Sequence, residues 1–156
     1  MRTPDELDEL FRSTGLRVTA PRRRIFEVLY DHRDHPTAEA VYARVHTDMP
    51  TVSLKTVYQA LHTLAELGEV GVLDVGTGAT RSDTNTGEHH HLVCSSCGTV
   101  WDLSPGVMGA PVTSEEVPGF TIDRAEVVYR GRCEQCRLDR GPETTKPSRQ
   151  QEDRRV

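Results

Sequence analysis

The 156-residue sequence predicts an α+β chain, in which a helical N-terminal half precedes a smaller half rich in β-strands. Up to about residue 67, apolar residues recur at the three- and four-residue intervals of amphipathic helices. From residue 70 onward, short apolar segments are separated by turn residues, as in strands. Residues 88–97 hold three histidines and two cysteines. These observations predict a helical unit, a small sheet and a metal-binding stretch at the start of that sheet.

Four helices are expected in the N-terminal half. They cover residues 4–13, a segment after Thr19 that ends near residue 31, a segment after Thr37, and residues 54 to about 67. Thr19, Thr37 and Ser53 can each cap the helix that follows, because their hydroxyls accept a hydrogen bond from its first turn. His35 and Met49 each precede a proline, a position that disfavours helix, and therefore separate neighbouring helices.

A two-stranded hairpin is expected over residues 70–75 and 79–83, because a Gly-Thr-Gly turn joins two strand-like segments. Helices followed by such a hairpin form the outline of a winged helix-turn-helix, whose recognition helix would begin at Ser53. DNA contacts are expected from polar side chains of that helix and from arginines before it. These residues are Arg17, Arg22, Arg23, Lys55, Thr56, Tyr58 and Gln59. The same side chains also fit the solvated face of an ordinary helix, so that alternative stays open.

Composition allows this interpretation without requiring it. The formal net charge of −5 argues against a uniformly basic nucleic-acid-binding surface. Five arginines nevertheless lie between Arg12 and Arg24 with no acidic residue among them, so a local basic face is compatible with the acidic total. Only 5% of the residues are aromatic, which predicts thin cores that a bound metal can support.

Two Cys-x-x-Cys pairs indicate a metal site. Cys94 with Cys97 and Cys133 with Cys136 supply four thiols, the ligand number of tetrahedral Zn²⁺. A redox dithiol and a pair of disulfides are the alternatives. The charged N-terminal segment has no secretory apolar core, and no segment reaches the roughly 18 apolar residues of a membrane span. We therefore expect a cytoplasmic protein with reduced cysteines and a closed, structural zinc site.

The second half is predicted to form a three-stranded sheet over residues 89–94, 99–103 and 120–129. A sheet this small has open edges, which a second copy of the chain often completes. Residues 104–119 are rich in glycine and proline, and no element is predicted there. The expected domains are a winged-helix DNA-binding domain at 1–82, a small α/β metal-binding dimerisation domain at 83–138, and a disordered tail at 139–156.

The order of these features resembles the ferric uptake regulator family of metal-dependent repressors. The matching segments are Gly15-Leu-Arg-Val-Thr19, His35-Pro-Thr-Ala-Glu39, Val52-Ser-x-x-Thr56-Val-Tyr58, His89-His-His-Leu-Val-Cys94-x-x-Cys97 and Tyr129-x-Gly-x-Cys133-x-x-Cys136. The resemblance covers residues 6–138. It implies a homodimer in which two winged helices bind a palindromic double-stranded DNA operator and are joined by the C-terminal sheets.

The resemblance also implies a regulatory metal site at the hinge between the two domains. Its ligands would be His35, Asp83, His89, His91 and Asp102. Three imidazoles and two carboxylates form a nitrogen and oxygen set that suits Fe²⁺ or Mn²⁺. Because these residues come from both halves and from the linker, a bound metal would fix the relative orientation of the domains and couple metal binding to DNA binding.

Within this resemblance, Asp102 favours the peroxide-sensing branch, because iron-uptake repressors typically carry glutamate at that position and peroxide-sensing repressors typically carry aspartate. The mechanism implied is that bound Fe²⁺ reacts with hydrogen peroxide and the oxidant formed in place attacks His35 or His89. Manganese would keep the repressor on DNA without that reaction. A ferric-uptake or zinc-uptake regulator without peroxide chemistry is the alternative inside the family.

Some members have a third metal site, and here Glu88 and His90 are available for one. Its further histidine position is Ala125, so we expect the site to be absent or incomplete and His90 to face solvent. Two alternatives lie outside the family: an enzyme with a catalytic zinc held by the histidine run, and a zinc-ribbon module that binds protein. The first lacks the nucleotide-binding and hydrolase motifs, and the second leaves His35 and Asp83 without a role. We therefore predict a repressor and not an enzyme.

Overall fold

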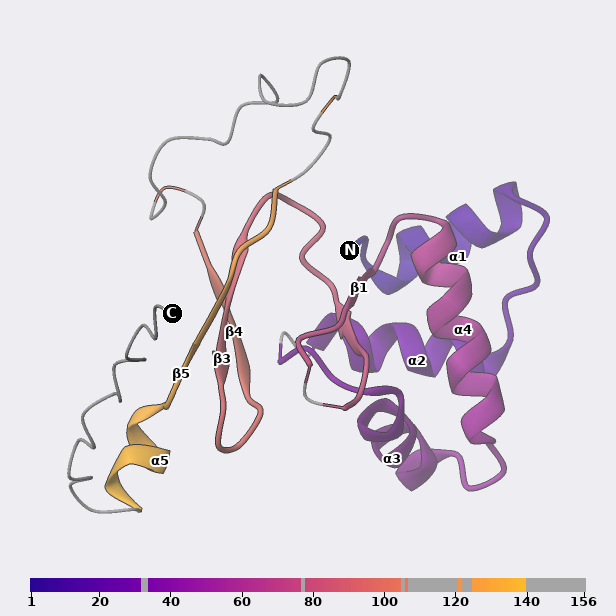
Figure 1. Ribbon diagram of the computed structural model, residues 1–156. Coiled ribbons are helices and arrows are strands. Elements are labelled where there is room, and N and C mark those ends of the chain that lie inside the picture. The colour runs from indigo at the N-terminus through magenta and orange to yellow at the C-terminus, as the bar shows by residue number, and fades with distance from the viewer. Residues whose placement is uncertain (32–33, 77, 105, 107–120, 122–124, 140–156) are drawn as a thin grey trace, which may run out of the picture.

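The computed structural model describes residues 1–31, 34–76, 78–104, 106, 121 and 125–139. Its elements are α1 (Pro4–Ser13), α2 (Ala20–Asp31), α3 (Ala38–Asp48), α4 (Leu54–Glu66), β1 (Gly71–Leu73), β2 (Arg81–Asp83), β3 (His90–Cys94), β4 (Val100–Leu103), β5 (Val128–Gly131) and α5 (Glu134–Leu138). Helices α1–α4 pack together on one side of the β1–β2 hairpin, and β3–β5 lie on its other side (Figure 1). The α+β class and the four predicted helices are confirmed.

The three predicted N-caps are present. The hydroxyl of Thr37 accepts from the backbone N–H of Ala40, and that of Ser53 accepts from Thr56. Thr19 accepts from the N–H of Arg22 at 3.4 Å, at the start of α2. These bonds satisfy backbone donors that have no partner inside their own helix, which fixes where each helix begins.

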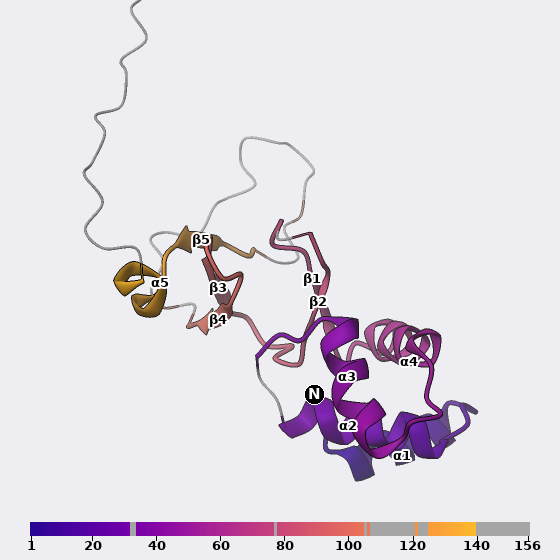
Figure 2. The same cartoon turned by 90° about the horizontal axis from the view of Figure 1, so that it is seen from below.

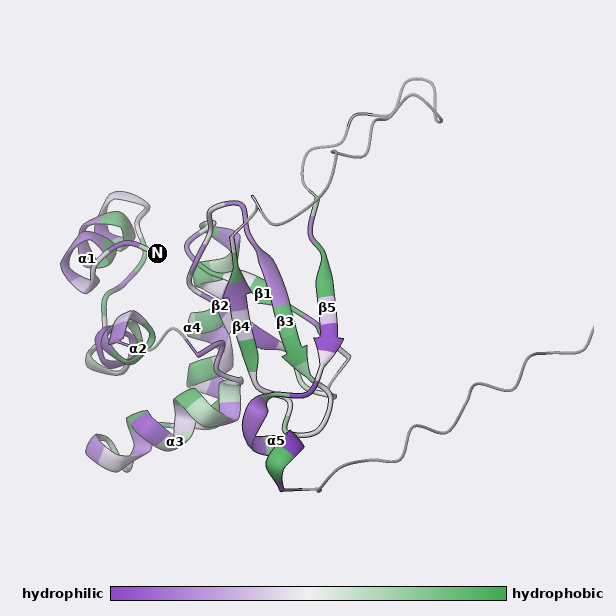
Figure 3. Ribbon diagram, turned by 90° about the vertical axis from the view of Figure 1, so that its left-hand side faces the viewer, coloured by the Kyte–Doolittle hydropathy of each residue, from purple (hydrophilic) through white to green (hydrophobic). Residues whose placement is uncertain are grey.

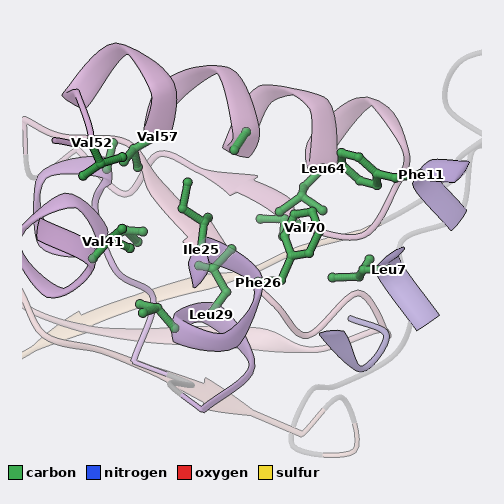
Figure 4. Packing of buried hydrophobic residues seen from close by; sticks show 14 residues of the cluster. Leu7, Phe11, Ile25, Phe26, Leu29, Val41, Val52, Val57, Leu64 and Val70 are labelled. Carbon is green, nitrogen blue, oxygen red and sulfur yellow. The ribbon is translucent and has the colours of Figure 1, made fainter. Parts of the chain in front are cut away.

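The helical half has one apolar core. Residues from all four helices are buried in it, including Phe11, Phe26 and Leu64, and Val70 lies beside them just before β1 (Figure 4). The rings of Phe11 and Phe26 meet edge to face with their centroids 5.0 Å apart. Burial of these apolar faces holds the helices as one unit, because the hydrophobic effect scales with the apolar area removed from water.

The predicted hairpin forms but is shorter than expected. Strands β1 and β2 pair antiparallel over three residues each, with Gly71 opposite Asp83 and Leu73 opposite Arg81. An additional bridge joins Arg81 to Thr37 at the start of α3. The hairpin therefore carries its second strand back to the segment between α2 and α3, where His35 lies.

The C-terminal sheet has the strand order β4-β3-β5, with β3 antiparallel to β4 and parallel to β5. Seen from below, this sheet lies to one side of the helices, with the β1–β2 hairpin between them (Figure 2). Strand β5 covers Val128–Gly131, whereas 120–129 was predicted. The prediction was wrong in extent for 125–127, because β3 offers a pairing partner only over its own five residues. The five-residue helix α5 was not predicted.

A second, smaller core joins the hairpin to this sheet. It consists of Leu73 and Val75 from the hairpin side and Val93 and Val100 from β3 and β4. Figure 3 shows both hydrophobic and hydrophilic segments within each of β3, β4 and β5. Because the second core lies on both sides of residue 83, the hairpin and the sheet are packed together; the domain boundary at that position stays a prediction.

Most of the segment 104–119 and the tail from 140 onward lie outside the described residues. Within the described part of the chain, no helix is both long enough and apolar enough to cross a membrane.

Candidate metal centres and DNA-binding face

The five residues of the predicted hinge site come together in the structure. One ligand atom from each of His35, Asp83, His89, His91 and Asp102 lies within 4.8 Å of all the others. They come from five places in the chain: the segment between α2 and α3, the end of β2, the residue before β3, β3 itself and β4. We call this set the hinge centre.

Strand geometry places three of these side chains on one face. His89 and His91 are two residues apart, so an extended backbone projects them in the same direction. Asp102 lies directly opposite His91 in the antiparallel pair of β3 and β4, and opposed side chains share a face. The sequence alone predicted the alternation of the two histidines; the pairing with Asp102 needed the register.

His35 reaches the hinge centre through an uncommon backbone conformation. Its φ angle is +49°, and it is the only non-glycine residue with positive φ in the described part of the chain. Such a conformation is costly for an L-residue and persists only when surrounding contacts hold it, as often occurs at functional sites. Pro36 follows directly, and its carbonyl accepts a bond from the N–H of Ser82 at 2.9 Å. The hairpin therefore holds the segment that presents His35.

The hydrogen bonds of two histidines fix which nitrogen faces the centre. Nδ1 of His89 lies 2.9 Å from the carbonyl oxygen of Gly87, and Nδ1 of His91 lies 2.8 Å from Oε1 of Glu126. Both partners are acceptors, so each Nδ1 carries the proton and each Nε2 of a neutral ring carries a lone pair. These two Nε2 atoms are only 3.0 Å apart. Two lone pairs at that distance repel each other, and a cation bound by both nitrogens and by the carboxylates would relieve the repulsion.

The carboxylates complete this arrangement. Oδ2 of Asp83 is 3.0 Å from Nε2 of His89, and Oδ1 of Asp102 is 2.8 Å from Nε2 of His35. Asn85 orients both acids: its backbone N–H donates to Asp83 Oδ1 and its side-chain amide donates to Asp102 Oδ2, each at 2.8 Å. Nε2 of His35 is buried and makes no aligned hydrogen bond within the described residues.

A divalent cation fits the donors of the hinge centre. Two carboxylates supply oxygen donors, and three buried imidazoles supply nitrogen donors. Burial lowers the pKa of His35, against the opposing effect of Asp102 and Asp83, so this ring favours the neutral form that binds metal. Mixed nitrogen and oxygen ligands without sulfur suit Fe²⁺ or Mn²⁺.

The four cysteines form a second centre, and none of them is in a disulfide. Cys94 ends β3, Cys97 lies in the following turn, and Cys133 and Cys136 lie at the start of α5 and within it. The sulfurs of Cys97 and Cys133 are 3.9 Å apart. Four sulfurs bound at about 2.3 Å around a tetrahedral zinc lie about 3.8 Å from one another, so the spacing fits Zn²⁺.

Thiol ionisation in the four-cysteine centre also fits a cation. The backbone N–H of Cys133 donates to Sγ of Cys94 at 3.4 Å, and this bond lowers the pKa of the Cys94 thiol to about 6. Its neighbour Cys133 raises the pKa of Cys136 to about 12. The thiol of Cys94 therefore ionises more easily than an ordinary cysteine, whereas that of Cys136 ionises less easily, because adjacent thiolates repel each other. A bound Zn²⁺ would allow all four to be thiolates.

The predicted DNA-binding residues lie on α4, in the first half of α2 and, for Arg17, just before α2. Lys55, Tyr58 and Gln59 are exposed on α4, whereas Thr56 is half-buried with its hydroxyl 2.9 Å from that of Ser53. The hydroxyl of Tyr58 donates to Oε1 of Glu39 at 2.6 Å, which links α4 to α3. The exposed face expected for recognition is therefore present; whether it contacts DNA stays a prediction.

The predicted arginines differ in how freely they can reach a phosphate. Arg17 is exposed, and Arg22 packs its guanidinium over the Phe11 ring at 5.6 Å while donating to the Arg17 carbonyl. The guanidinium of Arg23 instead contacts three carboxylates at 2.8–3.1 Å, those of Asp5, Asp8 and Glu27. This arrangement leaves Arg23 less available for DNA than the sequence indicates.

The expectation that His90 faces solvent was wrong. Its side chain is 7% exposed, although it points to the opposite face of β3 from His91. Strand β3 is the middle strand of the sheet, so both of its flanks are paired, and Leu103 lies directly across from His90. Ala125, the position expected to lack a ligand, is exposed.

Two residues that orient ligands were missed by sequence reasoning. Asn85 follows Asp83 by two residues, a spacing typical of an Asx turn, so a local signal was available. Glu126 is 35 residues from its partner His91, and nothing near it in the sequence indicates the contact.

Comparison with known proteins identifies the family. A sequence profile described as the Ferric uptake regulator family matches residues 13–129. The chain belongs to this family. Its members are metal-responsive transcriptional regulators rather than enzymes, as the four-cysteine motif and hinge ligands led us to expect. The chain is 36% identical over 137 residues to the transcriptional regulator FurA of Mycobacterium tuberculosis, covering 86% of this chain and 92% of that one.

Further similarity extends to a peroxide regulator and to solved structures. The chain is 33% identical over 129 residues to the peroxide operon regulator of Bacillus subtilis, covering 82% of this chain and 89% of that one. The Helicobacter pylori ferric uptake regulator, whose structure is described as revealing three functional metal-binding sites, aligns with a TM-score of 0.69. That alignment covers 85% of this chain and 89% of the other at 18% identity, and it supports the fold alone.

Proposed function

We propose that this regulator is a DNA-binding repressor that senses peroxide through iron-dependent oxidation of a ligand histidine. The observation that carries the proposal is the hinge centre, where lone pairs of His89 and His91 meet 3.0 Å apart beside two carboxylates. This geometry suits a cation, and its ligands come from both halves of the chain. The protein would act in the cytoplasm, in keeping with four cysteines free of disulfides.

Metal binding would control DNA binding through orientation. His35 belongs to the segment between α2 and α3, while His91 and Asp102 belong to the C-terminal sheet. Ligation by both halves favours one relative placement of α4 and the sheet. In a homodimer, that placement sets the separation of the two α4 helices, and a twofold dimer requires a palindromic operator. Metal and DNA would then strengthen each other's binding by the same factor.

A self-complementary surface on the sheet supports the dimer. Leu92 and Trp101 are 40% and 42% exposed, and they are direct partners across β3 and β4. Tyr129 is the partner of Leu92 on the other side, in β5. Three large side chains in one row across a small sheet form an apolar face that a second copy of the chain would cover.

Asp102 and its surroundings support the peroxide branch. The Asp102 side chain is 35% exposed, in contrast to the buried histidines. It lines a polar cavity of about 280 Å³ together with His35, Asp83 and Asn85. A molecule as small and polar as hydrogen peroxide can therefore reach the ligands from solvent. The resemblance of the chain to the Bacillus subtilis peroxide operon regulator favours the same branch.

An iron ion held by these five residues would supply the redox chemistry of the response. Overall, one oxygen atom of hydrogen peroxide would be added to a ring carbon of a ligand histidine, the other would leave as water, and the ring would be oxidised by two electrons. His35 and His89 are both buried at the hinge centre, and either ring would lose its role as a ligand when oxygen is added to its carbon. Loss of one ligand out of five releases the constraint between the halves. The four-cysteine zinc would meanwhile hold α5 and the turn after β3, so the sheet stays folded during the response.

The competing function is a metal-uptake regulator without peroxide chemistry. The similarity to FurA of Mycobacterium tuberculosis, at 36% identity, favours this alternative on sequence. Both functions use the hinge centre and the same DNA-binding face. They differ in whether a ligand histidine gains oxygen.

An operator-binding assay separates the two. The zinc-loaded protein would be filled anaerobically with Fe²⁺ or Mn²⁺, bound to operator DNA and then exposed to low hydrogen peroxide. A peroxide sensor loses DNA binding only in the iron form, and mass spectrometry of its peptides shows one added oxygen on His35 or His89. Retained binding with unmodified histidines in both forms would instead establish the metal-uptake function.

A further inference from the structure

Arg81 joins the two metal centres through its side chain. It lies in β2, and its Nη1 donates to the backbone carbonyl of His35 at 3.0 Å. Its Nη2 donates to the backbone carbonyl of Gly98 at 2.9 Å. These partners lie 46 and 17 residues away in the sequence, so one planar guanidinium links a hinge ligand to the turn that carries Cys97.

At the hinge, Arg81 helps to hold the uncommon backbone conformation of His35. His35 has φ +49° and precedes a proline, so its carbonyl direction is not fixed by any regular element. The backbone of Arg81 bridges Thr37, and Ser82 donates to the Pro36 carbonyl. The side chain of Arg81 adds the bond to the His35 carbonyl itself. The direction of the His35 ring therefore depends on where the guanidinium lies.

At the other end, the acceptor belongs to the zinc turn, which we define as residues 94–99. Gly98 has φ +72°, and its N–H donates to the carbonyl of Cys94 at 2.8 Å to close the turn. Cys97 precedes Gly98, and its sulfur is 3.2 Å from the hydroxyl of Thr99. A metal bound by Cys94 and Cys97 would fix this turn and hence the Gly98 carbonyl.

The surroundings of Arg81 indicate positioning rather than charge pairing. Within the described part of the chain, the guanidinium donates to two backbone carbonyls and makes no ion pair with a carboxylate, and its Nε is buried without a hydrogen-bond partner. An arginine that stabilised the fold through an ion pair would have the carboxylate of an aspartate or glutamate beside its guanidinium. The guanidinium of Arg81 stays protonated at all physiological pH values, and two of its N–H groups donate to two backbone carbonyls.

We propose that Arg81 is a positioning residue that couples the four-cysteine centre to the hinge centre. The zinc turn holds the guanidinium, and the guanidinium holds the His35 carbonyl so that its imidazole faces the other hinge ligands. This inference rests on the proposed function, because it requires a metal at the hinge. Coupling between binding sites is reciprocal, so ordering of His35 by a hinge metal must in turn order the zinc turn.

The chain offers a matched pair of variants. Arg81→Met removes both hydrogen bonds while keeping an unbranched stem of similar bulk. Arg130→Met is the control, because Arg130 lines the same hollow over the zinc turn and no hydrogen bond joins it to His35. The hairpin and sheet share the core of Leu73, Val75, Val93 and Val100, so Arg81→Met is expected to fold and keep its zinc.

Hydrogen exchange followed by mass spectrometry measures the coupling as a change in the protection of backbone amides, and it needs neither DNA nor peroxide. Zinc-loaded protein is compared before and after addition of Mn²⁺. In the unaltered chain and in Arg130→Met, peptides over residues 94–99 and the peptide that contains His35 both gain protection. In Arg81→Met, protection at residues 94–99 no longer responds to Mn²⁺. The Mn²⁺ affinity, measured from the electron paramagnetic resonance signal of free Mn²⁺, falls by about tenfold or more, as for other residues that orient a metal ligand.

The possible outcomes distinguish a failure of the coupling through Arg81 from a failure of the proposed metal-dependent function. Unchanged Mn²⁺ affinity and a full response at residues 94–99 in Arg81→Met would overturn the coupling while leaving the hinge metal in place. A response confined to the His35 peptide in the unaltered chain would overturn it too, and this test needs no variant to fold. Failure of the unaltered chain to bind Mn²⁺ at the hinge would overturn the proposed function and the coupling with it.

Discussion

Nδ1 of His91 lies 2.8 Å from Oε1 of Glu126, and this contact determines which nitrogen of the ring faces the hinge centre. A carboxylate can only accept, so the proton stays on Nδ1 and the lone pair stays on Nε2. The carboxylate also makes the ring a stronger donor to a cation. Glu126 therefore acts on the metal through His91, although it lies outside the set of five hinge ligands.

Removing Glu126 should weaken metal binding without unfolding the chain. Residues that orient a ligand in this way typically contribute 10- to 100-fold to metal affinity, so Glu126→Ala is expected to raise the Kd for Mn²⁺ by about tenfold or more. Glu126→Gln should restore much of the loss, because its amide oxygen still accepts from Nδ1. Competition against an indicator of known Mn²⁺ affinity measures both values.

Glu66 supplies the control for that prediction. It is a surface carboxylate near an exposed histidine, with Oε1 3.6 Å from Nε2 of His62 and both side chains well exposed. Glu66→Ala should leave Mn²⁺ affinity unchanged. Equal affinities for Glu126→Ala and Glu66→Ala would show that the His91 ring is oriented without Glu126.

Local sequence patterns were sufficient for much of the fold. Thr37 and Ser53 cap α3 and α4 as expected, because capping depends on residues within one turn. Gly68 follows α4 in a left-handed conformation with φ +71°, the conformation for which glycine is favoured just after the last turn of a helix. The helices and the hairpin follow from short-range rules, and so does the shared direction of His89 and His91.

Features that depend on distant partners were not predictable from one sequence. The extent of β5 is limited by the length of β3, and the burial of His90 follows from the position of β3 in the middle of the sheet. Helix α5 has five residues, too few for an apolar period to show. Glu126 and Arg81 gain their roles only when segments far apart in the chain meet.

Asp102→Glu tests the peroxide branch directly. Glutamate is longer by one methylene, so it can still reach the metal and can bring a second oxygen toward a coordination position that peroxide would use. The variant is expected to keep metal-dependent operator binding, while its iron form loses DNA binding more slowly in peroxide than the unaltered protein does. Gel shift and peptide mass measure the two effects. Equal peroxide sensitivity in both proteins would remove the residue-level reason for choosing this branch.

Loss of a ligand from the four-cysteine centre and loss of a ligand from the hinge centre should have different effects on the protein. Cys94→Ser replaces a buried thiol by a hydroxyl that does not ionise, and zinc in structural sites contributes on the order of 10 kcal/mol to folding. This variant is expected to lose zinc and to unfold or become monomeric. His89→Ala removes one hinge ligand and should leave a zinc-loaded, folded dimer whose DNA binding no longer responds to metal. Circular dichroism, zinc content and size-exclusion chromatography compare them, and a folded, dimeric Cys94→Ser would disprove the structural role of zinc.

Charge placed in the apolar row of the sheet should disrupt the dimer. Leu92 is the middle residue of the row formed with Trp101 and Tyr129. Central interface residues often contribute about 2 kcal/mol or more, so Leu92→Lys should raise the dimer Kd by about 30-fold or more. Val72→Lys is the control, because Val72 is 69% exposed on β1 and belongs to no such row. Sedimentation equilibrium would show a dimer for both variants if the sheet face were not the interface.

The pH dependence of the metal-free protein follows from the burial of His35. Burial lowers the pKa of this ring below its ordinary value of 6.5, and the carboxylates of Asp102 and Asp83 only partly oppose that effect. Between the lowered pKa and 6.5, the unfolded chain binds more protons than the folded chain. The free energy of unfolding should therefore decrease as pH falls below about 6.5 and level off once the folded ring is also protonated.

Nuclear magnetic resonance of the His35 ring protons, assigned by comparison with His35→Gln, gives the midpoint directly. We expect a midpoint below 6.5 in the metal-free protein, and a smaller loss of stability on acidification in His35→Gln than in the unaltered chain. A midpoint above 6.5 would mean that Asp102 and Asp83 outweigh burial. Protons would then compete with the metal for His35 at higher pH, and metal-dependent DNA binding would weaken on mild acidification instead of persisting.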